Sequence, residues 1–324
     1  MGVYVHIPFC ERKCYYCDFH SVVVSDPREF AQIADNYLIS LQQEALYYRR
    51  LWGEQRLTTL FIGGGTPNIL PAEKLATFIS FVLSELPFSE EPEITIEANP
   101  HFLTLEDAQI LATAGVNRVS LGVQAFENDL LKAIGRVHVV EDIEQSVFNL
   151  NKAGIKDINL DLMFGLPAQT KEQWFETLKA AISLKPTHLS CYGLILEPHT
   201  PFATWYSAGL LDLPDDDLQA DMYELACGFL VEAGFEHYEI SNFCLPDQRS
   251  RHNLHYWHNL PFIALGSGAT GYINNLRYTN VPDLKGYMQG WEQGTPHYES
   301  EELTSIDQEM DETMMLGMRL LQGV

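Results

Sequence analysis

The sequence predicts an α/β fold, a partial (β/α)6 barrel of the TIM type followed by a smaller C-terminal α/β region. Strand-like runs and helix-like patterns alternate through the first two hundred of the 324 residues, and this alternation is typical of a parallel sheet with right-handed crossovers. We favour an open or partial barrel over a flat doubly wound sheet. The alternation loosens near residue 200, so we expect the barrel in residues 1–200 and the smaller region in residues 201–324.

The predicted elements follow in order along the chain. The six strands are apolar runs bounded by turn residues, at Val3–Ile7, Leu57–Ile62, Glu93–Glu97, Asn117–Leu121, Lys156–Leu162 and Thr187–Leu194. The helices between them have recognisable ends. We expect one helix with Pro27 in its first turn that stops before Gly53, one that opens at Pro71, one from Thr104 to Gly115, one from Val140 to Ala153, and one that starts with a capping box at Thr170 and Gln173. Later we expect a loop from Glu197 to Leu213, a helix over Asp215–Ala233, a strand at Phe235–Ile240, an uncharged stretch from His252 to Leu276, and helices after Pro282 and from Ser305.

Composition excludes several classes of protein. Lys and Arg number 20 against 44 Asp and Glu, and the net charge of −24 disfavours binding to nucleic acid or to anionic membranes. No targeting or membrane-spanning segment is apparent. Three of the six cysteines fall within the first seventeen residues, which indicates metal chemistry in a reducing cytoplasm. The last predicted helix is apolar on one face, which indicates that it packs against a partner. The sequence alone does not decide whether the chain ends naturally here or is truncated.

Cys10, Cys14 and Cys17 form a C-x3-C-x2-C pattern directly after the first strand. Three thiolates on one short loop suit a 4Fe–4S cluster in which one iron has no protein ligand. A structural zinc is the alternative, with His20 or His6 as its fourth ligand. Spacing alone leaves both open.

A glycine turn, Gly63-Gly64-Gly65-Thr66-Pro67, follows the second strand. Glycines allow a ligand to approach the backbone closely, although a tight strand-to-helix turn alone would also use them. The turn is not a dinucleotide-binding fingerprint, because Asn68 stands where the last glycine of that pattern should be.

A polar residue, a cysteine or a glycine of the turn lies at or just beyond the end of every predicted strand: Cys10, Gly64, Glu97, Gln124, Asp161 and Tyr192. In a parallel barrel these ends share one face, where such folds place their chemistry. Any one of these residues could be a cap or a turn residue, but all six together indicate a functional face.

The segments YVHIPFCERKCYYCDF, GGGTP, IEANP, GVQAF, IGRVH and DLMFGLP resemble the radical S-adenosylmethionine (SAM) proteins related to oxygen-independent coproporphyrinogen oxidase. The resemblance covers nearly the whole chain. It implies that Cys10, Cys14 and Cys17 hold a 4Fe–4S cluster whose open iron binds SAM. It further implies SAM contacts from Tyr4, Tyr16, Gly64, Gly65, Thr66, Glu97, Gln124, Arg136 and Asp161.

Within that family the chain is more similar to the heme chaperones than to the oxidase. Asp18 and Phe19 follow the last cysteine of the cluster motif, where the oxidase has a further cysteine two residues on. The resemblance implies that heme is bound as cargo and passed to a respiratory acceptor protein. It also implies a partner that donates electrons. Whether the protein forms a homodimer, and whether it cleaves SAM, stays open. The oxidase activity is the alternative.

The resemblance also implies a heme site at the segment HNLHYW, with His252, Tyr256 and Trp257 as contacts. An imidazole suits heme iron, and aromatic rings suit the macrocycle. The alternative is a polar loop buried against the mouth of the barrel, in which His252 is only hydrogen-bonded.

Overall fold

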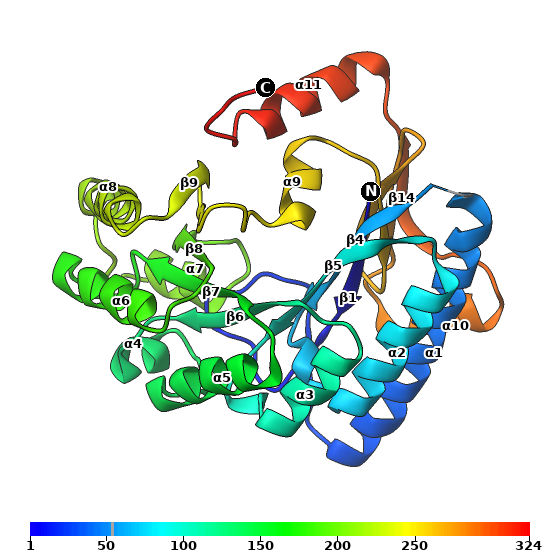
Figure 1. Cartoon of the computed structure of the whole chain (residues 1–324), viewed down its shortest axis with the longest axis horizontal. Coiled ribbons are helices and arrows are strands. Elements are labelled where there is room, and N and C mark those ends of the chain that lie inside the picture. Colours follow the sequence, from blue (N-terminus) through cyan, green and yellow to red (C-terminus); the bar gives the residue numbers. More distant parts are fainter. Residues whose placement is uncertain (53–54) are drawn as a thin grey trace.

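The computed structural model describes residues 1–52 and 55–324. Six parallel strands form the centre of the fold, as predicted: β1 (Gly2–Ile7), β4 (Leu57–Gly64), β5 (Phe88–Ala98), β6 (Arg118–Gln124), β7 (Asp157–Phe164) and β8 (His188–Gly193). They lie side by side in that order within a curved sheet that has two free edges, so the barrel is partial (Figure 1).

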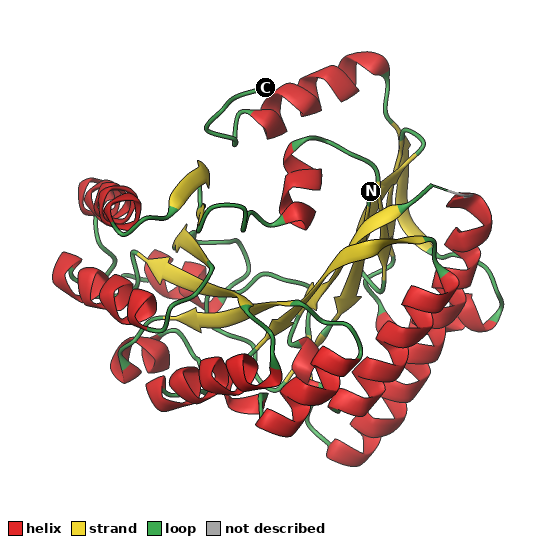
Figure 2. Cartoon of the chain, viewed as in Figure 1, coloured by secondary structure: helices red, strands yellow, loops and turns green. Residues whose placement is uncertain are grey.

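The helices of the first part cover one face of this sheet (Figure 2). They are α1 (Pro27–Trp52), α2 (Ala72–Glu85), α3 (Leu105–Thr113), α4 (Asn128–Ala133), α5 (Val140–Ala153) and α6 (Lys171–Ser183). Capping boxes at Thr104 and Thr170 start α3 and α6, which confirms the predicted helix starts. The stop predicted at Gly53 lies outside the described residues, although α1 does extend to Trp52.

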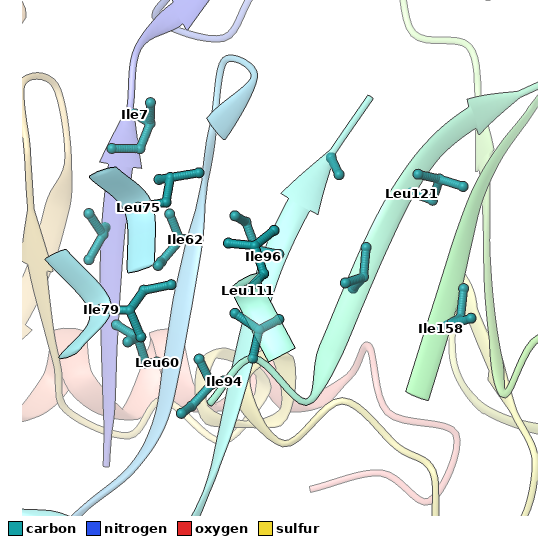
Figure 3. Close-up of a cluster of buried hydrophobic side chains, with 14 of the residues drawn as sticks. Ile7, Leu60, Ile62, Leu75, Ile79, Ile94, Ile96, Leu111, Leu121 and Ile158 are labelled. Atoms are coloured by element: carbon teal, nitrogen blue, oxygen red, sulfur yellow. The ribbon is translucent and has the colours of Figure 1, made fainter. Parts of the chain in front are cut away.

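Alternation along the strands separates an apolar face from a polar one. In β7 the side chains of Ile158, Leu160 and Leu162 are buried in the core, whereas Asp157, Asn159 and Asp161 make polar contacts. Figure 3 shows the apolar face, where isoleucines and leucines of neighbouring strands meet Leu75 and Ile79 of α2 and Leu111 of α3. The polar side chains therefore line the inside of the barrel.

Residues after 200 extend the same sheet at both edges. β10 (Asn242–Cys244) and β9 (Glu236–Glu239) continue it antiparallel beyond β8. At the other edge β11 (Phe262–Leu265) pairs parallel with β1, followed by antiparallel β12 (Thr270–Ile273), β13 (Leu276–Asn280) and β14 (Tyr298–Leu303). The helices of this region are α7 (Pro201–Ser207), α8 (Asp216–Glu232), α9 (Arg251–Trp257), α10 (Leu284–Glu292) and α11 (Ile306–Gly317).

The C-terminal segment links the two edges of the open barrel. α11 follows β14 at one edge, and the residues after α11 reach β9 at the other, where Glu239 bridges to Leu320 (Figure 1). The two parts predicted on either side of residue 200 thus share one sheet. Among residues 1–52 and 55–324 no helix is long and apolar enough to cross a membrane.

Candidate functional site

A cavity of about 330 Å³ opens at the C-terminal ends of the parallel strands. It brings together all three predicted cluster cysteines and most of the predicted SAM contacts: Cys10, Cys14, Cys17, Tyr16, Gly64, Gly65, Thr66, Glu97, Gln124, Arg136 and Asp161. Tyr4 is absent from this lining. These residues are far apart in the sequence, and they meet because the strands are parallel and their C-terminal ends share one end of the curved sheet.

The cysteine loop leaves the barrel directly after β1. Cys10 belongs to β2 (Phe9–Cys10), which pairs with β3 (Val22–Val23), and this pairing closes the loop that carries Cys14 and Cys17. All three thiols are free, and Cys10 is buried. Burial raises the pKa of Cys10 and raises that of Cys17 to about 11, so both sulfurs become good metal ligands only when a cation replaces their protons.

The donor set fits an iron–sulfur cluster better than a single zinc ion. Both ring nitrogens of His6 are engaged, Nδ1 with the Tyr4 hydroxyl at 2.9 Å and Nε2 with the carbonyl of His20 at 2.9 Å. Among the described residues no three His, Cys, Asp or Glu side chains converge as a single ion would require. In a cluster each thiolate binds a separate iron, so the three sulfurs can line one cavity without meeting at one point.

Arg136 connects the cysteine loop to the strand ends. Its Nη1 donates to Sγ of Cys14 at 3.6 Å, and its Nη2 donates to Oδ1 of Asn99 at 2.5 Å and to the carbonyl of Gly122 at 2.6 Å. Asn99 in turn donates to Thr66, whose hydroxyl donates to Sγ of Cys10 at 3.6 Å. The buried Nε of Arg136 has no partner among the described residues, and a guanidinium donor of this kind suits a ligand carboxylate.

Glu97 and Asp161 form an acidic wall of the same cavity. Glu97 accepts a hydrogen bond from the backbone N–H of Gly64 at 3.0 Å. Burial, together with the nearby charge of Asp161, raises the pKa of Glu97 to about 8. Burial also raises the pKa of Asp161, against hydrogen bonds from Ser120 and Asn159 that lower it. A cationic ligand would relieve this repulsion, and SAM carries a sulfonium and an ammonium group.

Glycines are required in this turn because neighbouring residues lie too close to leave room for a β-carbon. A β-carbon on Gly65 would lie 2.7 Å from the carbonyl oxygen of Phe9 and 3.0 Å from Sγ of Cys10. A β-carbon on Gly64, whose φ is +114°, would lie 2.6 Å from the ring of His6. These two glycines let the turn and the cysteine loop pack against each other.

Tyr4 and Gln124 differ from the other predicted SAM contacts in their position or backbone conformation. Tyr4 lies deeper in the barrel, hydrogen-bonded to His6, so its predicted SAM contact stays a prediction. Gln124 lines the cavity at the end of β6 with a φ of 67°, a left-handed conformation that is uncommon outside glycine.

Several residues of this site were not among those predicted from the sequence. Asn99, Ser120 and Gly122 line the cavity, and Asn159 lies behind Asp161. The alternation of polar and apolar residues along β6 and β7 is the signal that could have found Ser120 and Asn159.

The predicted heme segment forms α9, at the opposite end of the barrel from the cysteines. The side chain of Glu93 caps this helix, accepting from the backbone N–H groups of Arg251 and His252 at 2.9 Å each. A β-carbon on Gly2, the first residue of β1, would lie 3.1 Å from the ring of His252. In Figure 1, α9 accordingly lies near the N-terminus, where the parallel strands begin.

His252 is fully buried, and both of its ring nitrogens are engaged. Nδ1 lies 2.7 Å from the hydroxyl of Thr59, and Nε2 lies 2.8 Å from the hydroxyl of Tyr256. Burial lowers the pKa of His252 well below its usual value, so the ring is neutral. This is the arrangement expected of the alternative in which His252 is only hydrogen-bonded, although the segment is a helix and not the loop we expected. Coordination of heme iron by His252 stays a prediction, and it would require one of these hydrogen bonds to break.

The two aromatic residues predicted to contact heme are partly buried. Tyr256 packs edge to face against Phe262, with ring centroids 4.8 Å apart. Trp257 lies under the guanidinium of Arg319, whose Cζ is 4.3 Å from the ring centroid. The buried Nε1 of Trp257 has no partner among the described residues.

Comparison with protein families gives a match over residues 4–181 to the model described as the radical SAM superfamily. The chain is 40% identical over its whole length to the heme chaperone HemW of Lactococcus lactis, covering 82% of that protein. It is 42% identical, again over its whole length, to the heme chaperone HemW of Bacillus subtilis, covering 84% of that protein.

Among solved structures, coproporphyrinogen III oxidase (HemN) from Escherichia coli, described as a radical SAM enzyme, is similar with a TM-score of 0.83. The sequence identity is 26%, and the match covers 96% of this chain and 73% of the oxidase chain. The similarity extends through both the barrel and the region after residue 200.

Proposed function

Because this chain belongs to the radical SAM superfamily and, within it, to the HemW heme chaperone family, we propose that it binds heme and delivers it to an acceptor protein. The observation that carries the heme part of the proposal is the full-length similarity to the heme chaperones HemW, at 40% and 42% identity. The cavity at the C-terminal ends of the strands, where three free cysteines lie beside Arg136, Glu97 and Asp161, supports the cluster and SAM part. This donor set suits a 4Fe–4S cluster and SAM.

The side chains of the chain have distinct roles in this proposal. Cys10, Cys14 and Cys17 would each hold one iron of the cluster. Arg136 donates from Nη1 to Sγ of Cys14, and its unpartnered Nε would bind the carboxylate of SAM. Glu97 and Asp161 would bind the ammonium group or the ribose hydroxyls of SAM.

When bound, the cluster supplies an electron for reductive chemistry at the sulfonium of SAM, which the protein's own residues cannot provide. The protein positions and shields this chemistry. Gly64 and Gly65 allow close backbone approach, and Tyr16 and Met163 add bulk to the wall of the cavity.

Heme delivery is favoured over coproporphyrinogen oxidation by the comparisons. Full-length relatives at 40% and 42% identity carry the heme chaperone name, whereas the oxidase structure is 26% identical. The cluster motif also continues with Asp18-Phe19 rather than with the further cysteine of the oxidase.

The remaining partners are proposals that rest on this family. We propose a respiratory protein as the heme acceptor, a separate electron donor for the cluster, and a cytoplasmic location. A homodimer is a further proposal, which size-exclusion chromatography with light scattering would test.

An anaerobic assay that contains both heme and coproporphyrinogen tests the proposal. Cluster-loaded protein, SAM and a reductant are incubated with both compounds, and the products are identified by mass. We expect heme bound to the protein with a defined Soret band and no loss of carboxyl groups from coproporphyrinogen. Decarboxylated product that disappears with the Cys14→Ala variant would establish the oxidase alternative.

A further inference from the structure

A column of hydrogen-bonded side chains runs through the inside of the barrel behind Asp161. The carboxylate of Asp161 accepts from Nδ2 of Asn159 at 2.8 Å and from the hydroxyl of Ser120 at 2.9 Å. Oδ1 of Asn159 lies 2.6 Å from Nδ1 of His188, whose Nε2 lies 2.8 Å from the hydroxyl of Tyr238. Asn159, His188 and Tyr238 are all buried.

The directions of these hydrogen bonds are mutually consistent. Burial and the nearby charge of Arg118 lower the pKa of His188 well below its usual value, so its ring is neutral and has one donor and one acceptor nitrogen. Nδ1 must donate, because it faces the carbonyl oxygen of Asn159. Nε2 then accepts from Tyr238, and the amide nitrogen of Asn159 points toward Asp161.

This order fixes the orientation of the Asp161 carboxylate. If the Asn159 amide were turned around, its oxygen would face the acceptor carboxylate of Asp161, and its NH2 group would face the donating Nδ1–H of His188. Its Oδ1 also accepts from the hydroxyl of Ser190 at 3.2 Å, and its Nδ2 also donates to Ser120 at 2.7 Å. A buried amide held at each of its atoms is a rigid support for the group it contacts.

We propose that Asn159 and His188 are positioning residues for SAM, which hold Asp161 so that its free lone pairs face the cavity. Neither residue lines the cavity, and each acts through Asp161. The inference rests on the SAM-binding part of the proposed function. Tyr238 extends the column to the opposite end of the barrel, where its hydroxyl accepts from the backbone N–H of Ser250, the N-cap of α9, at 3.4 Å.

SAM affinity of cluster-loaded variants tests the proposal. His188→Leu removes the donor to Asn159, and Tyr238→Phe removes the hydroxyl that fixes the histidine tautomer while it retains the ring. Tyr278→Phe is the matched control, because Tyr278 is also buried and its hydroxyl bonds to the backbone of Ala264 and to Tyr48, near the opposite edge of the sheet. Isothermal titration calorimetry gives the SAM dissociation constant. Electron paramagnetic resonance of the reduced cluster reports the binding of SAM at the cluster.

We expect the SAM dissociation constant to rise about five- to tenfold in His188→Leu and about two- to threefold in Tyr238→Phe, as for a weakened charge-assisted hydrogen bond. Iron content should be unchanged in both variants, and the SAM-induced change of the resonance spectrum should be altered. Tyr278→Phe should bind SAM as the unmodified protein does.

Folded His188→Leu and Tyr238→Phe proteins with unchanged SAM affinity and spectra would overturn the proposal. If His188→Leu does not fold, the nearly isosteric Tyr238→Phe decides alone. Unmodified protein that does not bind SAM would overturn the proposed function and this inference together.

Discussion

The hydroxyl of Thr59 on β4 lies 2.7 Å from Nδ1 of His252 on α9. The two residues are separated by 193 positions, and both are buried. Together with the capping of α9 by Glu93, this contact fixes the helix across the end of the barrel where the strands begin. The segment predicted to contact heme is therefore also part of the packing of the barrel.

Replacement of His252 tests which of these roles it has. We expect His252→Ala to lower the free energy of unfolding by about 1–3 kcal/mol, because Thr59 and Tyr256 each lose a buried hydrogen-bond partner. Denaturant titration measures this loss, and His258→Ala, at an exposed position just after α9, is the control. If His252 also binds heme iron, as the sequence predicts, heme titration of the folded variant should give a shifted Soret band or a large loss of heme affinity. An unchanged band and affinity would contradict His252 as an iron ligand.

The cluster and α9 lie at opposite ends of the barrel, so they should be separable by mutation. We expect Cys14→Ala to lose the broad visible absorbance and the reduced-state resonance signal of the cluster, because one iron loses its thiolate. Heme binding should persist in this variant, since α9 makes no described contact with the cysteine loop. Loss of both properties in a protein with a normal circular dichroism spectrum would place heme at the cluster end.

Much of this architecture could be predicted from local patterns. The six parallel strands, the capping boxes and the positions of Cys10, Glu97 and Asp161 at strand ends all follow from periodicity and turn chemistry. The short helices α4 and α7 were not predicted, and α7 lies where we expected a loop. The helix α9 was not predicted either, since its residues fall almost entirely in the uncharged stretch that begins at His252. Ser250 caps α9, but seven residues carry too little periodicity to show a helix.

Contacts between distant segments could not be predicted. The pairing of β11 with β1, the capping of α9 by Glu93 and the column behind Asp161 each join segments with no local signal of their proximity. The buried state of His252 depends on these contacts, so the segment HNLHYW alone could not decide whether His252 is a heme ligand or a packed residue.

The raised pKa of Glu97 predicts a pH dependence of stability in SAM-free protein. In the folded protein this carboxyl stays protonated up to about pH 8, against 4.5 for an ordinary glutamate. Between these values the folded state holds a proton that the unfolded chain has released, so stability should fall as the pH rises through that window. Denaturant titrations at pH 6 and at about pH 8.5 measure the fall.

Glu97→Gln should reduce this fall, because an amide cannot ionise. Glu106→Gln, at an exposed position on α3, should retain it. If the fall is the same in Glu97→Gln as in the unmodified protein, other groups cause it, and the raised pKa of Glu97 is contradicted.

Gly65→Ala should lower the iron content of the reconstituted protein. The new methyl group would meet the carbonyl oxygen of Phe9 at 2.7 Å and Sγ of Cys10 at 3.0 Å, so the cysteine loop must move. Gly228→Ala is the matched control, because a β-carbon there meets nothing within 4 Å and alanine is favourable inside a helix such as α8. Iron and sulfide analysis after anaerobic reconstitution measures the difference. Equal iron content in the two variants would show that the close approach of the turn is not needed.

The most direct test of the account is the metal content of anaerobically prepared protein, measured together with the response of the reduced cluster to SAM. We predict about four iron and four sulfide per chain, and a resonance spectrum that changes when SAM is added. One zinc per chain, with no iron–sulfur signal and no effect of SAM, would contradict the assignment of Cys10, Cys14 and Cys17 and of the cavity they line.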